Sequence, residues 1–123
     1  AVDRNNPRVA DIYSAFHPAV LGALHHVVKE SHLEQRSVSI CGEMAGDPGA
    51  AVLLIAMGFD ILSMNSAALL RVKSVIRNVS LSAAKELLKR VMEMDNTQSI
   101  RKAVDLMLYN SGVDRILRSS RTN

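Results

Sequence analysis

Apolar residues recur at helical spacing near the start of the chain, and this pattern predicts the first helix. In Pro18–His32 the intervals between apolar positions place them on one stripe of a helix, which is typical of a helix buried on one side. Pro18 suits the first helical position, where no backbone N–H is needed. The stripe consists of Val20, Leu21, Leu24, Val27 and Val28.

Two short segments further along have the pattern of strands. Ser37–Cys41 alternates between polar and apolar residues, and Phe59–Met64 is a second segment of similar length. Between them, Asp47-Pro48 supplies a helix cap followed by proline at the first helical position, and Gly58 is a plausible stop. The helix between Pro48 and Gly58 is apolar on nearly all sides, so we expect it to be buried on more than one side.

Three further helices are expected toward the C-terminus. Asn65 or Ser66 caps a helix that continues to about Ile76, and two more cover Leu81–Met94 and about Gln98–Tyr109. Gly112 would end the last of them. Residues 114–123 are expected to form a flexible tail.

The alternation of strands and helices after Ser37 predicts parallel βα units and an α/β fold. Two strands are clear, and part of a third could precede Arg8. Parallel strands belong to larger sheets covered on both faces, so we expect residues 1–123 to be a terminal portion of a larger α/β domain. The alternative is a small helical domain in which Ser37–Cys41 and Phe59–Met64 are only extended connections.

Composition narrows the class of protein. The chain has 123 residues, of which 48% are apolar and 22% charged, which fits one ordinary folded domain. The longest apolar run, Ala50–Met57, is far shorter than the roughly 20 residues that span a bilayer, so we expect no membrane insertion. A net charge of +3 is too small to require a nucleic-acid partner. One cysteine favours a reducing compartment, and we expect a cytoplasmic location.

The segment Cys41–Pro48 (CGEMAGDP) carries the most chemical information. It lies where a predicted strand passes into a helix, which is where α/β folds place their active sites. Glycines at Gly42 and Gly46 let the backbone approach a ligand closely, and a thiol at this place can act as nucleophile or proton donor. Two structural alternatives remain: Cys41 as an inert core residue, and Asp47 as a helix cap and nothing more.

Several motifs together resemble the phosphoenolpyruvate-protein phosphotransferase family, enzyme I of the bacterial phosphotransferase system. They are CGEMAGDP at 41–48, Val2-Asp3-Arg4 upstream, and Gly58-Phe59-Asp60 with Leu62-Ser63-Met64 downstream. The resemblance covers nearly the whole chain. Residues 4–10, 17–21 and 62–65 are more similar to the nitrogen-related branch of the family than to the sugar-transport branch.

The resemblance implies a TIM-type (βα)8 barrel, of which this chain would be about the last two βα units with the terminal helices. It implies that a phosphoryl group passes from phosphoenolpyruvate to an enzyme histidine and then to a histidine phosphocarrier protein, with release of pyruvate. Cys41 matches the family's proton donor and acceptor at the methylene carbon. Arg4 matches an active-site arginine that binds phosphate, and Gly42 and Glu43 would shape the substrate pocket.

The resemblance also implies groups that this chain does not supply. The Mg²⁺ ligands and the phosphorylated histidine of the family would lie upstream of Ala1, so no residue here is assigned to metal binding. We therefore expect this chain alone to be inactive. The family forms homodimers, and the alternative function is a non-catalytic dimerisation or interaction module.

Other chemically suggestive residues have simpler explanations. The histidines lack a carboxylate that would complete a zinc site, so we expect them to be structural. Met64 is placed at a strand end, where it could line the site. Arg71, Lys73 and Arg77 are expected to form a solvated helix face, because aromatic residues that would stack on nucleic-acid bases are nearly absent around them.

Overall fold

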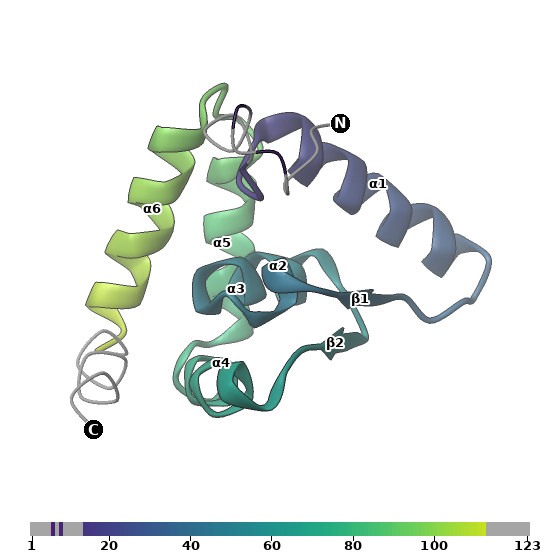
Figure 1. Ribbon diagram of the computed structural model, residues 1–123. Coiled ribbons are helices and arrows are strands. Elements are labelled where there is room, and N and C mark those ends of the chain that lie inside the picture. Colours follow the sequence, from purple (N-terminus) through teal and green to yellow (C-terminus); the bar gives the residue numbers. More distant parts are fainter. Residues whose placement is uncertain (1–5, 7, 9–13, 113–123) are drawn as a thin grey trace.

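The computed structural model describes residues 6, 8 and 14–112, and it has a helix-rich α/β fold (Figure 1). Within these residues the elements follow one another as α1 (Pro18–Leu33), β1 (Ser39–Cys41), α2 (Glu43–Gly46), α3 (Pro48–Met57), β2 (Ile61–Ser63), α4 (Ser66–Asn78), α5 (Leu81–Val91) and α6 (Thr97–Asn110). All the predicted helices and both strands are present in the predicted order. The short helix α2 is an addition that the sequence pattern did not indicate.

The two strands form a parallel pair, as the alternation of elements predicted. Ser39 is opposite Ile61, and Cys41 is opposite Ser63. The alternative of a purely helical domain is therefore wrong. The possible strand before Arg8 and the tail at 114–123 lie outside the described residues.

The helix α3 is the centre of the hydrophobic core. It contacts α1, α2, α4, α5 and α6, and its buried residues are Gly49, Ala50, Ala51, Val52, Leu53, Leu54, Ala56 and Met57. The expectation of burial on more than one side is thus confirmed (Figure 1). Helices of the same chain cover it on these sides.

Residue size and backbone conformation set the position of α3 at both ends. A Cβ added at Gly49 would lie 2.6 Å from Cγ1 of Val104, so the absence of a side chain lets α6 approach closely. Gly58 ends the helix with φ 102°, a left-handed conformation that glycine adopts without strain. Asp47 caps the other end by accepting a hydrogen bond of 2.9 Å from the N–H of Ala50.

The sheet is covered by helices on one face. Ile40 and Leu62 pack against the core, whereas Ser39, Cys41, Ile61 and Ser63 are exposed. Because the strands are parallel, their carboxyl ends lie at one edge, where β1 leads into α2 and β2 leads toward α4 (Figure 1). This edge holds the site described below. No helix among the described residues is long and apolar enough to cross a membrane.

Candidate functional site at the carboxyl ends of the strands

Cys41 is the last residue of β1, and its thiol is free and exposed. The alternative of an inert core cysteine is therefore wrong. Gly42 follows with φ 97° and ψ −167°, a backbone conformation that residues with a side chain rarely adopt. This turn ends the strand directly behind the thiol and leads the chain into α2 at Glu43.

The thiol lies at the wall of an open hollow of about 550 Å³. The hollow brings together three of the predicted site residues, Cys41, Gly42 and Glu43, and it includes Met64 as the sequence suggested. Gly46, which the sequence also placed in this segment, lines the hollow too. The remaining lining residues were not predicted as part of a site: Ser63, Asn65, Ala67, Ala68 and Arg71. The parallel pairing explains their presence, because it brings the β2–α4 connection beside the β1–α2 connection.

Small residues allow α2 and α4 to meet beneath the hollow. A Cβ added at Gly46 would lie 3.0 Å from Cβ of Ala68, so Gly46 provides the space for the first turn of α4. The side chain of Asn65 caps this helix by accepting a hydrogen bond of 2.9 Å from the N–H of Ala68. The start of α4 is therefore held close to the segment that carries the thiol.

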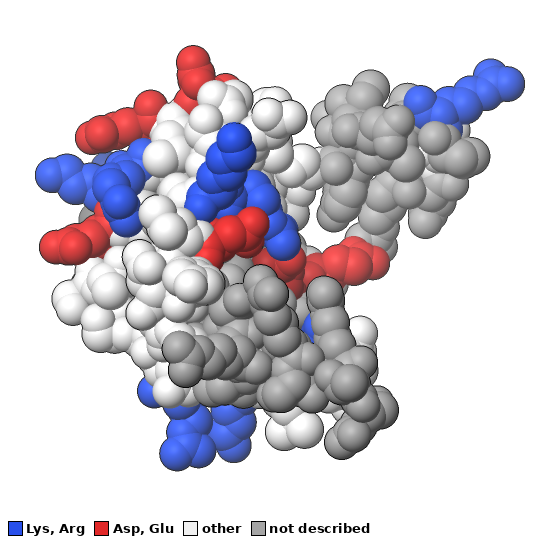
Figure 2. All heavy atoms as spheres, turned by 90° about the vertical axis from the view of Figure 1, so that its left-hand side faces the viewer, with Lys and Arg blue, Asp and Glu red and all other residues white. Residues whose placement is uncertain are grey.

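Arg71 departs from the sequence expectation of a solvated helix face. Lys73 and Arg77 are exposed as expected, but Arg71 is half-buried and lines the hollow. Figure 2 shows another face of the molecule, where Lys and Arg side chains lie in several groups, most of them beside Asp or Glu, with uncharged surface between the groups.

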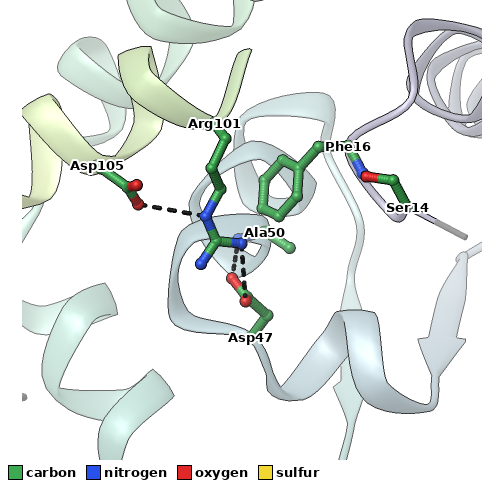
Figure 3. A network of polar contacts seen from close by, with 6 residues as sticks. All are labelled: Ser14, Phe16, Asp47, Ala50, Arg101 and Asp105. Carbon is green, nitrogen blue, oxygen red and sulfur yellow. Dashed lines mark hydrogen bonds and ion pairs between the residues drawn. The ribbon is translucent and has the colours of Figure 1, made fainter. Parts of the chain in front are cut away.

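A second polar cluster holds the other end of the Cys41–Pro48 segment (Figure 3). Nη1 of Arg101, on α6, lies 3.4 Å from Oδ2 of Asp47, and its Nε lies 3.4 Å from Oδ1 of Asp105. The guanidinium carbon is 4.8 Å from the centroid of the Phe16 ring, within range of a cation–π interaction. Asp47 thus caps α3 and also links it to α6. This second contact was not predicted from the sequence.

Asp60 joins the loop before β1 to the start of β2. Its Oδ2 accepts a hydrogen bond of 2.8 Å from the N–H of Val38 and lies 3.1 Å from Nε2 of His32. The hydrogen bond from Val38 is the largest cause, and His32 the next, of a pKa of Asp60 below its usual 3.8. His32 therefore has the structural role expected for the histidines.

Two expectations concern Arg4 and the metal ligands. Arg4 lies outside the described residues. Among the residues that the structure describes, no group of three or more His, Cys, Asp or Glu side chains could hold a metal ion.

The sequence that forms this parallel βα arrangement and its free thiol matches a known family of domains. The family described as PEP-utilising enzyme, PEP-binding domain, matches residues 1–81, and this chain belongs to that family. The hollow and all of its lining residues fall within the matched range.

Curated relatives agree with this assignment. The chain is 38% identical over 118 residues to the phosphoenolpyruvate-dependent phosphotransferase system protein of Salmonella typhimurium strain LT2, and 37% identical over 118 residues to that of Escherichia coli strain K12. Each match covers 96% of this chain and 16% of the relative. It is also 35% identical to the phosphoenolpyruvate-protein phosphotransferase of Haemophilus influenzae strain Rd, over 93% of this chain and 20% of the relative. The chain therefore spans only about a sixth to a fifth of these relatives.

Proposed function

We propose that this chain is the C-terminal portion of the barrel domain of a phosphoenolpyruvate-dependent protein phosphotransferase. The observation that carries the proposal is the exposed thiol of Cys41 at the carboxyl end of a parallel strand, in a chain of the PEP-utilising family. The order β1–α2–α3–β2–α4 fits two successive βα units of a TIM-type barrel, in which active sites lie at the carboxyl ends of the strands. A full barrel has about 250 residues, so further strands would come from outside this segment.

In the proposed reaction, the bond between phosphorus and the enol oxygen of phosphoenolpyruvate breaks, and the phosphoryl group passes to an enzyme histidine and then to a histidine phosphocarrier protein. The electrons of the broken bond remain on the enolate. The thiol of Cys41 donates its proton to the methylene carbon, which gives pyruvate and a thiolate that regains a proton from water. In the reverse direction the thiolate removes a proton from the methyl group.

The other predicted residues have supporting roles in this proposal. Gly42 and Glu43 shape the wall beside the thiol, and Arg4 would bind phosphate oxygens through its planar guanidinium. Mg²⁺ would be bound by residues of the larger protein and would neutralise phosphate charge. The proposal includes the nitrogen-related branch, on the sequence similarities at 4–10, 17–21 and 62–65. The exposed free thiol suits a reducing compartment such as the cytoplasm.

The test is phosphoryl transfer by the full-length protein that contains this segment. With Mg²⁺, phosphoenolpyruvate labelled in the phosphate and a histidine phosphocarrier protein, we expect label on the carrier and an equal amount of pyruvate. The isolated 123-residue chain should release no pyruvate under the same conditions. No transfer by the full-length protein, or sustained pyruvate release by the isolated chain, would contradict the proposal.

A homodimer is part of the proposal, and exposed apolar side chains support an interaction surface. Leu70 on α4 is 76% exposed and Leu106 on α6 is 58% exposed. The second candidate function, a non-catalytic dimerisation or interaction module, would use exposed apolar residues of this kind. Sedimentation of the full-length protein distinguishes the candidates when it is combined with the transfer assay, because a dimer without transfer favours the module.

A cooperative monomer of the isolated chain would oppose the idea that it is part of a larger barrel.

A further inference from the structure

Arg71 places a positive charge at the hollow that contains the thiol. It lies on α4 three residues after Ala68 and four after Ala67, and all three residues line the hollow. This spacing corresponds to one face of a helix. The side chain is half-buried, unlike those of Lys73 and Arg77 on the same helix.

The packing beneath the hollow fixes Arg71 relative to Cys41. The close approach of Gly46 and Ala68 holds the first turns of α4 against α2, and Asn65 caps the helix at the carboxyl end of β2. Cys41 and Arg71 therefore come from successive βα units and meet at one hollow. A ligand of modest size in about 550 Å³ would reach both walls.

The guanidinium of Arg71 is available to a ligand. Within the described part of the chain, it has no hydrogen bond or ion pair. Glu43 is the acidic residue among the described lining residues, and it already takes part in another interaction. A half-buried cation that has no protein acceptor gains more binding free energy from an anionic ligand than a fully solvated cation does.

We infer that Arg71 binds an anionic group, carboxylate or phosphate, of the substrate that Cys41 protonates. This inference rests on the proposed function and adds a substrate-binding residue to it. The planar fork of a guanidinium offers two parallel N–H donors to either group, which positions the substrate as well as attracting it. The methylene carbon would then be held facing the thiol.

The test compares Arg71→Gln, Arg71→Lys and Arg77→Gln in the full-length protein. Loss of one charge-assisted contact should raise KM for phosphoenolpyruvate roughly tenfold or more in Arg71→Gln. Arg71→Lys keeps the charge but lacks the fork, so its KM should be raised by a smaller factor. Arg77→Gln removes the same charge from the same helix outside the hollow and should leave KM unchanged. Equal KM values in Arg71→Gln and Arg77→Gln would overturn the inference.

Competition experiments identify the group that is bound. If Arg71 binds the carboxylate, inhibition by pyruvate should weaken in Arg71→Gln. If it binds the phosphate, inhibition by inorganic phosphate should weaken instead. If neither changes, the inference is wrong.

Two controls separate other causes of failure. Thermal unfolding reports whether Arg71→Gln folds, and if it does not, Arg71→Lys carries the test, with an unchanged KM overturning the inference. Failure of the wild-type protein to transfer phosphate would instead remove the proposed function. Transfer that depends on Cys41 but not on Arg71 would remove this inference alone.

Discussion

At the scale of single residues, Asp60 shows how one carboxylate connects two parts of the chain. Its Oδ2 receives the N–H of Val38 at 2.8 Å and lies 3.1 Å from Nε2 of His32. Val38 leads into β1, Asp60 precedes β2, and His32 lies in the last turn of α1. The carboxylate therefore helps to set the register of the two strands at their amino ends. The site lies at their carboxyl ends.

This contact predicts that Asp60 stabilises the fold at neutral pH and loses that effect in acid. The folded protein holds the pKa of Asp60 below its usual 3.8, so the unfolded chain binds a proton at higher pH than the folded chain does. The stabilisation is complete above the unfolded pKa and is lost as the pH falls through the folded pKa. We expect Asp60→Asn to lower the free energy of unfolding at pH 7, with the difference from wild type shrinking below about pH 4.

Urea unfolding over a range of pH measures this difference. Glu86→Gln, which changes an exposed acidic residue on α5, is the matched control and should follow the wild-type pH dependence. A constant difference between Asp60→Asn and wild type from pH 7 to pH 3 would contradict the role of the carboxylate charge.

Cys41 and Gly42 show what can be concluded from residue types before a structure is available. Their place between a strand and a helix, and the need for a glycine, followed from the sequence. The exposure of the thiol did not, because a lone cysteine is as compatible with a core as with a site. The exposed position of Cys41 in the folded chain decided between these alternatives, and exposure depends on long-range packing.

At the scale of elements, the close packing of α3 and α6 depends on Gly49. A Cβ at this position would be 2.6 Å from Cγ1 of Val104, which is completely buried. A real Cβ cannot remain at that distance, so one of the helices must shift. Because Gly49 lies in a regular helix, an alanine there would not strain its own backbone, so the expected cost comes from the contact with Val104.

We therefore expect Gly49→Ala to destabilise the fold by about 1–3 kcal/mol, despite the higher helix propensity of alanine. Gly22→Ala in α1 is the control: no atom lies within 4 Å of its added Cβ, so it should stabilise the fold by about 0.5–1 kcal/mol. Urea unfolding gives both values. The cost of Gly49→Ala should fall in a Val104→Ala background, and an unchanged cost would exclude this contact as the cause.

Most elements were predictable because their signals are local. Apolar spacing, Pro18, Asp47-Pro48 and Gly58 indicate helix faces and ends within a few residues. The helix α2 was missed because Glu43–Gly46 is about one turn long and too short to show a period. The position of Arg71 was missed because its basic neighbours follow an ordinary solvated pattern, and only the packing of Gly46 on Ala68 brings it to the hollow.

At the scale of the whole molecule, this chain covers its central helix on several sides but covers its sheet on one face only. Helices of this chain surround α3, so the core is closed. The sheet has one face packed on that core and one face exposed, with Ile61 56% exposed on the open face. This asymmetry fits the proposal that further strands of a barrel continue the sheet and complete the site around Cys41.

The steady-state turnover of Cys41→Ala in the full-length protein tests the central claim most directly. If the thiol protonates the methylene carbon, kcat for pyruvate release should fall by about 10²–10⁴-fold, whereas the Kd for phosphoenolpyruvate should stay close to that of the wild type. Cys41→Ala that releases pyruvate at the wild-type rate would contradict the account.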